Sequence, residues 1–505
     1  MTLIAQSSLT DFLAYTSNEN KLGYINLKGQ EIIPVEFDDI KSFSEGLIAV
    51  NKGAKKVEYE KVGGKWGYYN LKGEQVIPLK YDYAESFKEG LAPVRLNGTF
   101  GYINKQDKLI IPFQYQDAQS FSEELSGVKL NGKWGFIDKS GSMIIPPNFD
   151  DVRPFNNGLS IVFRKTLEYE YEDDGYTYTE IEGKYGLINK KGELLLETIY
   201  DYIGDFKNGF AKIELERKQG FIDLNGEISI PIIYDKVEDF SEGYAVVANY
   251  MLRNSYHNFG YTQKQTDSLK KEVEVLQSKI EPTDFNTLLN HPTYREYQRA
   301  KMQEPSEELL HGYIDTQGNL KIDFQFDQAE EFKNGLAQIR FGEQSFITMI
   351  RTDEKGNKLP SYREKVGMGD NLINKEGKLI LEKNYEIINR YNDSIFVLYD
   401  FKGAGAMKES QITLIKNQYQ NLSYLGNGYF LAQLNNSKIR IVIDKNNKEL
   451  FEWESKRIDY SGFDLFVVAI KSEKKTRSKK GIVNIKGKWI LEPKYDYIAE
   501  FRKIE

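Results

Sequence analysis

One acidic residue recurs along the chain in a position where carboxylate chemistry could be expected. An Asp directly follows the first aromatic residue of a recurring phrase in seven places: Asp38, Asp82, Asp150, Asp201, Asp235, Asp327 and Asp496. Two carboxylates placed close together can act as general acid and general base. A catalytic pair is needed only once, however, whereas a residue that caps a backbone turn is needed in every repeat. We therefore interpret these Asp side chains as hydrogen-bond acceptors for the N–H groups of turns.

The other residue types that usually carry chemistry are scarce. The 505 residues include no Cys and only three His, at His257, His291 and His311. Disulfides, thiolate nucleophiles and Cys-ligated metal sites are therefore excluded. The His spacings, 34 and 20 residues, match no local metal-binding motif. Because nucleophile elbows, phosphate-binding loops and dinucleotide fingerprints are also absent from the sequence, we expect a protein that is not an enzyme and has no cofactor or metal ion.

Composition and charge narrow the class of protein and of partner. With 40% hydrophobic and 28% charged residues, the chain is globular. A net charge of −7 disfavours nucleic acid as a partner. The N-terminal sequence MTLIAQSSLTDFLAYTSNEN lacks the basic segment and apolar run of a signal peptide, and no apolar run is long enough for membrane insertion. We therefore expect a cytoplasmic location.

The chain is organised as a repeat with a period of 34 residues. We take the Gly of the phrase Lys-Trp-Gly at Gly67 as the anchor of one copy. Aromatic residues stand 14 and 20 positions after the anchor, here Tyr81 and Phe87, and do so in all nine clear copies. Weaker copies anchored at Gly405 and Ile441 bring the total to about eleven. The nine clear anchors are Gly23, Gly67, Gly101, Gly135, Gly186, Gly220, Gly312, Asn371 and Gly481.

Each copy predicts a small antiparallel β-meander. The residues after the anchor predict a short strand, and a Gly six positions after it, such as Gly73, predicts a turn with positive φ. A second strand is predicted to end at a Pro such as Pro78. Residues 91–94 predict a third strand, which Asn97-Gly98 joins to the next copy by a hairpin. The stretch between the two aromatic residues fits either a twisted strand or a single helical turn.

This pattern resembles that of the WG (KWG) repeat family, over nearly the whole chain apart from its insertions. Trp-Gly itself occurs at Trp66-Gly67 and Trp134-Gly135. The match is specific because each copy extends the phrase with Ile-Pro, Tyr-Asp, Phe and Gly-Leu-Ala or close variants. The resemblance implies a β-rich repeat architecture, mostly found in bacterial proteins, and no particular reaction. At other anchors the Trp is replaced by Leu22, Phe100, Tyr185 or Gln219.

A unit of 34 residues is too small to be stable alone, so neighbouring units must pack on one another. We therefore expect an all-β repeat protein of about eleven meander units with one inserted α-helical hairpin. Eleven units exceed the four to eight blades of ordinary propellers, which favours an open solenoid or superhelix, with closed propeller-like rings as the alternative. The predicted division is an N-terminal array of six units at 1–247, a mostly helical insertion at 248–308, and a C-terminal array of about five units at 309–505.

Departures from the period are the best places to look for function, because insertions carry specificity. Between Gly135 and Gly186, seventeen extra residues alternate strictly around Asp174-Gly175, which predicts a protruding β-ribbon. Its plain interpretation is a solvated extension of the meander, and its functional one is an acidic, tyrosine-rich surface for a cationic partner. The candidate partner-binding residues here are Tyr169, Tyr171, Tyr176 and Tyr178 on one face, with Asp173 and Asp174 at the tip.

Ten extra residues between Gly23 and Gly67, fifty-eight between Gly220 and Gly312, and twenty-five between Gly312 and Asn371 also interrupt the repeat. Between Gly220 and Gly312, Thr266-Asp267 predicts the cap of a helix over 268–280, and Pro292 predicts the start of a second helix. This helical hairpin is either a structural element docked on the array or a partner-binding arm. Near the end, a basic run predicts a solvated loop or a contact with an anionic partner, including the acidic ribbon of another copy. Its candidate binding residues are Lys474, Lys475, Arg477 and Lys479.

The sequence therefore predicts a non-enzymatic, protein-binding repeat scaffold. A regulatory or immunity-type binder of a bacterial partner protein is its most specific form. A protein that binds glycans or cell walls is the alternative, and a hydrolase with dispersed carboxylates ranks last. The pattern indicates neither the identity of the partner nor an oligomeric state.

Overall fold

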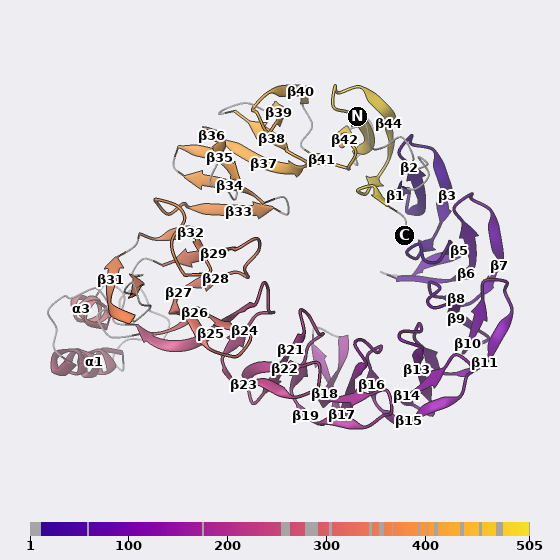
Figure 1. Ribbon diagram of the computed structural model, residues 1–505, viewed down its shortest axis with the longest axis horizontal. Helices are drawn as coiled ribbons and strands as arrows, with labels where there is room; N and C mark the ends of the chain where they lie inside the picture. The colour runs from indigo at the N-terminus through magenta and orange to yellow at the C-terminus, as the bar shows by residue number, and fades with distance from the viewer. Residues whose placement is uncertain are drawn as a thin grey trace.

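The structure is a computed structural model of the chain. It describes residues 12–57, 60–173, 176–253, 263–277, 291–301, 306–342, 346–352, 358–365, 367–391, 394–400, 402–408, 413–434, 439–453, 457–470 and 478–503. Within these residues, eleven small antiparallel sheets follow one another around a ring, with two helices at its periphery (Figure 1). The predicted all-β repeat architecture of about eleven units is confirmed, and the closed propeller-like ring is the arrangement that forms.

Each sheet runs from the inner to the outer edge of the ring (Figure 1). The strands at the inner edge, most of them two residues long, are β4 (Asp39–Ile40), β8 (Tyr83–Ala84), β12 (Asp117–Ala118), β16 (Asp151–Val152), β20 (Tyr202–Ile203), β24 (Lys236–Val237), β28 (Gln328–Ala329), β33 (Ile387–Tyr391), β37 (Asn421–Gly426), β41 (Ile458–Tyr460) and β45 (Tyr497–Ile498). The second strands are β1 (Phe12–Asn18), β5 (Leu47–Val57), β9 (Leu91–Leu96), β13 (Leu125–Leu130), β17 (Leu159–Asp173), β21 (Phe210–Leu215), β25 (Tyr244–Arg253), β29 (Leu336–Phe341), β34 (Ile395–Asp400), β38 (Tyr429–Gln433) and β42 (Leu465–Ile470).

The remaining strands complete the sheets toward the outside. The third strands are β2 (Lys21–Asn26), β6 (Glu60–Asn70), β10 (Thr99–Asn104), β14 (Lys133–Asp138), β18 (Tyr176–Asn189), β22 (Lys218–Asp223), β26 (Ser306–Asp315), β32 (Gly369–Asn374), β35 (Gly403–Lys408), β39 (Arg440–Asp444) and β43 (Lys479–Asn484). The outer strands are β3 (Glu31–Phe37), β7 (Gln75–Tyr81), β11 (Leu109–Tyr115), β15 (Met143–Phe149), β19 (Leu194–Tyr200), β23 (Ile228–Tyr234), β27 (Leu320–Phe326), β36 (Thr413–Tyr419), β40 (Glu449–Trp453) and β44 (Trp489–Tyr495). Outside the eleven sheets lie β30 (Phe346–Thr352) paired with β31 (Lys358–Lys365), and the helices α1 (Gln263–Gln277) and α3 (Pro292–Lys301).

Ring closure follows from the way in which sheets combine neighbouring repeat copies. The inner and second strands of a sheet come from the end of one copy, and the third and outer strands come from the next copy. The end of the last copy therefore pairs with the first strand: Thr16 faces Ile498 and Ser17 faces Tyr497 between β1 and β45, and β46 (Arg502–Lys503) continues the pairing. The open array favoured by the sequence is wrong because this exchange of strands pairs the two ends of the chain.

Neighbouring sheets pack face to face, and their aromatic residues account for the strict spacing of the repeat. The aromatic residue after the anchor contacts the Phe that stands 20 positions after the anchor, across the interface between two sheets. Ring centroids are 5.1 Å apart for Tyr102 and Phe121, and 4.7 Å apart for Phe136 and Phe155. The hydroxyls of Tyr68, Tyr102 and Tyr313 also donate to the carbonyl of the residue directly after the next inner strand, as Tyr68 does to Glu85 at 2.7 Å. Each interface is thus a core of its own.

The anchor Gly is required because the outer strand passes unusually close to it. At all eight Gly anchors of the clear copies, an added Cβ would lie 2.4–2.8 Å from the carbonyl oxygen of the residue ten positions later. A bulge produces this approach: Trp66 pairs with Tyr81 and Tyr68 with Ile77, so that Gly67 faces the extra residues between Ile77 and Tyr81. Only Gly leaves room for backbone at this distance.

Two units without an anchor Gly confirm this interpretation. At Asn371 the described residues form no outer strand, and the Asn371 amide instead donates to the carbonyls of Leu381 and Lys383, both at 3.3 Å. At Ile441 the outer strand is present without a bulge at the anchor, because Ile441 pairs directly with Glu452. The outer strand thus bulges where Gly permits it, and runs differently where a side chain occupies the space.

The Pro residues lie in the middle of the outer strands, and the prediction that they end these strands is wrong. Pro78 is the fourth residue of β7, and Pro112 holds the same place in β11. An outer strand pairs with a neighbour on one side only, so a residue without an N–H fits the bulge at its free edge. The turns, in contrast, are as predicted: Gly73 and Asn97 have φ values of 76° and 51°. The stretch between the two aromatic residues forms the short inner strand.

The recurring Asp residues connect neighbouring sheets. Asp82 accepts hydrogen bonds from Lys65 Nζ of the preceding sheet at 2.6 Å and from the Asn97 backbone N–H of the following sheet at 2.8 Å. We call this arrangement the inter-sheet bridge. It caps a turn, as expected, but a turn fifteen residues away rather than a local one. Lys–Asp pairs of the inter-sheet bridge join Lys21 to Asp38, Lys65 to Asp82, Lys133 to Asp150, Lys184 to Asp201, Lys218 to Asp235 and Lys479 to Asp496.

A second set of ion pairs holds the opposite edge of the sheets. Glu45 pairs with Lys105 at 3.0 Å, and Glu89 pairs with Lys139 at 3.0 Å. In each pair the Lys lies in the turn between a third and an outer strand, and the Glu belongs to the preceding sheet. The same carboxylates accept backbone N–H groups of the neighbouring inner turn, as Glu45 does from Gly90. Both edges are therefore tied where the sheet of β5 meets that of β9 and where the sheet of β13 meets that of β17.

The close approach at the anchor predicts a large cost for a single methyl group. Gly135→Ala places a Cβ 2.4 Å from the Ile145 carbonyl oxygen, and should lower the free energy of unfolding by about 2–3 kcal/mol. Hydrogen exchange should accelerate in β15. Gly367→Ala is the matched control, because nothing lies within 4 Å of its added Cβ. Equal stability of the two variants in urea unfolding would contradict the role of the anchor.

The inter-sheet bridge predicts how stability depends on pH. The Lys65 hydrogen bond lowers the pKa of Asp82 against the opposing effect of burial, and the Asn97 N–H lowers it further. A lowered pKa in the folded state stabilises the protein above the unfolded-state pKa, about 4, and this contribution is lost as the pH falls through the folded-state pKa. Asp82→Asn should therefore cost about 1 kcal/mol at pH 7, and the loss should shrink below pH 4.

Urea unfolding of Asp82→Asn at pH 7 and pH 3 tests this expectation. The control is Asp323→Asn, an exposed acid whose carboxylate accepts only the neighbouring Phe324 N–H in the described structure. A loss for Asp82→Asn that is the same at both pH values would exclude an ionic contribution from the bridge.

Candidate functional site

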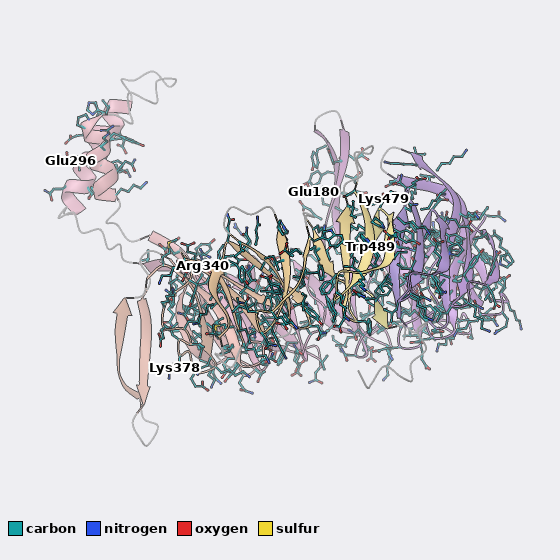
Figure 2. All side chains as sticks on the ribbon, turned by 90° about the horizontal axis from the view of Figure 1, so that it is seen from above. Glu180, Glu296, Arg340, Lys378, Lys479 and Trp489 are labelled. Carbon is teal, nitrogen blue, oxygen red and sulfur yellow. The ribbon has the colours of Figure 1, made fainter. Side chains whose placement is uncertain are left out.

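The insertions that break the repeat all emerge at one kind of hairpin. In the short form, a two-residue turn such as Asn97-Gly98 joins the second and third strands of a sheet. Six of the described sheets extend this connection: at β5–β6, at β17–β18, between β25 and β26, between β29 and β32, between β38 and β39, and between β42 and β43. We call the ring edge that carries these connections the insertion face. Figure 2 shows the β17–β18 ribbon and the two helices rising on the same side of the ring.

The predicted β-ribbon is present as the extended ends of β17 and β18. Its strands pair up to Asp173 and Tyr176, whose backbones are partners. Along it, Tyr171 lies opposite Tyr178, and their rings stack with centroids 5.5 Å apart and an interplanar angle of 23°. The Tyr169 ring follows at 6.4 Å from that of Tyr171. Three of the four predicted tyrosines thus form one row.

This row is exposed and lies among acidic residues. Tyr169, Tyr171 and Tyr178 are 39%, 46% and 44% exposed. The Tyr169 hydroxyl donates to Glu180 at 2.7 Å, which raises the pKa of Tyr169. The ribbon also carries the exposed acids Glu168, Glu170, Glu180 and Glu182. The side chains of Asp173 and Tyr176, and residue Asp174 as a whole, lie outside the described residues.

The basic run has a different outcome. Lys474, Lys475 and Arg477 lie outside the described residues, so their role stays a prediction. Lys479 is engaged within the ring: its ammonium lies 2.9 Å from Asp496 and donates to Asn18 at 2.5 Å. It therefore belongs to the inter-sheet bridge that joins the last sheet to the first. The spacing of 17 residues between Lys and Asp, which recurs in six copies, is the sequence signal for this role.

The two predicted helices of the insertion are present, with one boundary misplaced. α1 begins at Gln263, five residues before the predicted start, because Thr266 is buried within the helix instead of capping it. Val273 of the predicted apolar stripe is 3% exposed, and α3 starts at Pro292 as predicted. The strands that flank the insertion, β25 and β26, pair with each other. The insertion thus extends a single hairpin of the ring.

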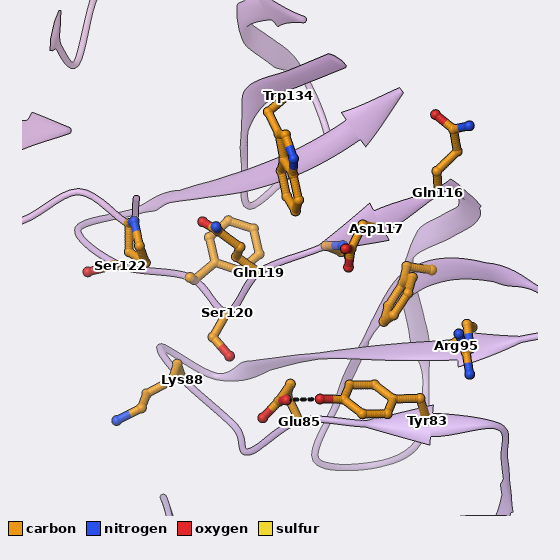
Figure 3. A pocket seen from close by; sticks show the side chains of 14 residues that line it. Tyr83, Glu85, Lys88, Arg95, Gln116, Asp117, Gln119, Ser120, Ser122 and Trp134 are labelled. Carbon is orange, nitrogen blue, oxygen red and sulfur yellow. Dashed lines mark hydrogen bonds between the residues drawn. The ribbon is translucent and has the colours of Figure 1, made fainter. Parts of the chain in front are cut away.

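The sequence interpretation missed a cleft at the inner edge of the ring. It has a volume of about 890 Å³ and lies between the sheets β8–β11 and β12–β15 (Figure 3). Phe100, Trp134, Asp117 and Arg95 are among the residues that line it. Asp117 alone does not signal the cleft in the sequence, because the same repeat position holds Tyr83, Tyr202 and Tyr497 in some copies but Asp39 and Asp151 in others.

Other kinds of site were sought in the described part of the chain. It contains no group of three or more His, Asp or Glu side chains that could hold a metal ion. His311, in the Trp position of its copy, is 9% exposed, and burial lowers its pKa. No helix of the described residues is long and apolar enough to cross a membrane.

Comparison with known structures shows only distant similarity. The chain is similar to a protein described as "Crystal structure of the eukaryotic initiation factor", with 12% identity and a TM-score of 0.33, over 81% of this chain and 96% of that chain. It is also similar to the dihydro-heme d1 dehydrogenase NirN in complex with DHE, with 8% identity and a TM-score of 0.25, over 85% of this chain and 78% of that chain. Among curated proteins no significant match was found.

Comparison with protein families gives a direct match. The model of the WG containing repeat matches residues 23–55, 66–99, 100–134, 134–164, 185–218, 220–249, 312–343 and 481–503. These segments follow the anchors identified from the sequence and reach from the first sheet of the ring to the last. The chain therefore belongs to the family of WG-repeat proteins.

Proposed function

We propose that this WG-repeat protein is a non-enzymatic scaffold that binds another protein through its insertion face, with the β17–β18 ribbon as the main contact. The observation that supports this most strongly is the exposed row of Tyr169, Tyr171 and Tyr178. The ring does not need the ribbon, because the neighbouring sheets close the same hairpin with two residues. A protruding segment that the fold does not require is available for recognition.

The chemistry of the row suits a protein surface. Tyr side chains offer a large apolar area at a small cost in side-chain entropy, together with a hydroxyl for hydrogen bonding, and are enriched in interfaces. Stacking of Tyr171 on Tyr178 restricts both rings before binding, which reduces the entropy lost on association. The acids along both strands favour a cationic partner and increase the rate of association.

The ring supplies a rigid base for this contact. Lys165 N, at the root of the ribbon, donates to Asp150 at 3.0 Å, and Lys133 pairs with the same carboxylate at 2.6 Å. The ribbon is thus held by the inter-sheet bridge of the preceding sheet. The recurring carboxylates are used in these bridges. This use favours a structural role for them over a catalytic one.

Shortening the ribbon to the length found in its neighbours tests the proposal. In the tested variant, Asn-Gly replaces residues 165–183, which restores the two-residue turn seen at Asn131-Gly132. The ring should stay folded because the replaced residues lie beyond the strand pairs shared with other sheets. The amounts of the proteins that co-purify with the full chain from its native cells should fall at least tenfold with this variant, because it lacks the Tyr row. Quantitative mass spectrometry measures these amounts.

The matched control replaces residues 53–64 of the β5–β6 hairpin by Asn-Gly and should keep these proteins. Recovery of the same proteins with both variants would contradict a role for the ribbon. Recovery should also decline as the salt concentration rises, because the acids of the ribbon attract the partner through screened charges.

A further inference from the structure

A row of interleaved aromatic rings follows the inner part of the sheets, and the cleft lies where this row is interrupted. In the complete part, the Tyr83 ring lies between Trp66, at 5.8 Å, and Phe100, at 5.9 Å. Trp66 and Phe100 each precede an anchor Gly, and Tyr83 stands 16 positions after the anchor Gly67. We call this series the aromatic ladder.

At the next step of the aromatic ladder a carboxylate replaces the ring. Asp117 stands 16 positions after the anchor Gly101, between Phe100 and Trp134. Figure 3 shows Asp117 next to Trp134, on the side toward Tyr83 and Arg95. Asp is far smaller than Tyr, so no ring of the described residues fills the space between Phe100 and Trp134. The cleft of about 890 Å³ opens there, between the two sheets.

The ladder attracts cations wherever the chain itself supplies them. Lys41 Nζ lies 4.8 Å from the Tyr83 ring centroid and 5.5 Å from that of Trp66. The Arg95 guanidinium lies 5.9 Å from the Tyr83 ring and 5.8 Å from the Phe100 ring. Each position thus gains from the attraction between a cation and the face of an aromatic ring.

At the interrupted step Arg95 covers the Phe100 ring, but among the described residues no Lys or Arg lies over the Trp134 ring. Asp117 accepts a hydrogen bond from the Ala118 N–H at 2.8 Å and forms no ion pair within the described residues. Lys129 is its partner across the strands, but neither pairs with it nor covers a ring there. Of the other charged residues that line the cleft, Glu85 is bonded to Lys41 at 2.9 Å, and Arg95 covers Tyr83 and Phe100. Lys88 lies on the same wall as Glu85.

The equivalent step one sheet further on is filled by the chain. There Asp151 takes the place of Asp117, and its strand partner is Phe163. The Phe163 ring packs on Tyr185 with centroids 5.0 Å apart. At the step of Asp151, the ring of Phe163 therefore occupies space that stays open at the step of Asp117.

We infer that this cleft binds an arginine side chain of the partner protein, an inference that rests on the proposed function. A guanidinium group is planar and weakly hydrated, so it can enter between aromatic side chains while it forms a bidentate ion pair with a carboxylate. Trp134 supplies the preferred ring for a cation, and Asp117 supplies the carboxylate. A lysine fits less well because its ammonium is a compact, strongly hydrated charge.

Fluorine NMR of the full chain can detect this contact. Labelling with 5-fluorotryptophan gives one signal for each of Trp66, Trp134, Trp453 and Trp489. The probe is the peptide Ac-Gly-Arg-Gly-NH2, with the uncharged citrulline peptide as its isosteric control. The arginine peptide should shift the Trp134 signal saturably and leave Trp66 in place, because Tyr83 fills the step beside Trp66. The citrulline peptide should bind at least fivefold more weakly.

Three variants separate the cleft from a general effect of charge. Asp117→Asn should weaken binding of the arginine peptide at least fivefold. Asp151→Asn is the matched control and should leave binding of the peptide unchanged. Asp117→Tyr should abolish the shift and raise the thermal midpoint, because it completes the aromatic ladder. The rise in the midpoint also shows that loss of binding is not loss of folding.

Several outcomes would overturn the inference. These are an unmoved Trp134 signal, equal shifts of all four signals, or equal binding to Asp117→Asn. A shift caused by free L-arginine but not by the peptide would assign the cleft to a small molecule, and a shift caused only by a neutral oligosaccharide would assign it to glycans. Loss of partners on shortening the ribbon tests the proposed function separately, so either result can stand without the other.

Discussion

The close approach of the outer strand to the anchor Gly is the constraint on which the rest of the structure depends. It permits the bulge, and the bulge places the aromatic residue that ends the outer strand, such as Tyr81, opposite the residue before the anchor. From that point the chain crosses to the inner edge of the next sheet. A side chain at the anchor changes this path, as Asn371 and Ile441 show. Each anchor Gly is therefore needed twice: for the outer strand of its own sheet and for the path of the chain into the next sheet.

The two edges of the sheets are held in different ways, and this difference explains where insertions occur. At the edge opposite the insertion face, ion pairs such as Glu89–Lys139 use the turn itself. An insertion there would separate the Lys from its partner. At the insertion face, the Asp of the inter-sheet bridge pairs with a Lys of the preceding sheet and takes from the following sheet only one backbone N–H, at the start of its hairpin. That N–H is kept even where a long ribbon follows, as at Lys165, so this hairpin can lengthen without disturbing the junction.

Local features were predictable from the sequence, and features that depend on the path of the whole chain were not. The turns at Gly73 and Asn97 follow from the conformational preferences of those residues alone. The eleven units follow from their spacing. Closure of the ring depends on the rotation between successive sheets, which no single copy encodes. Pro78 was misplaced because the strand pattern does not reveal which strand has a free edge. Of the candidate site, the ribbon was predictable from its alternation, whereas the cleft depends on the absence of one ring at Asp117.

The most direct test of a closed ring is a disulfide between its first and last sheets. The natural chain has no Cys, so the double variant Ser17→Cys/Tyr497→Cys has only these two thiols, at residues that are partners in the pairing of β1 with β45. Paired strands place such residues within disulfide range. Oxidation of the monomer should therefore consume both thiols and form an intramolecular disulfide, seen as faster migration in a denaturing gel without reductant. Two free thiols after oxidation of the folded monomer would contradict ring closure.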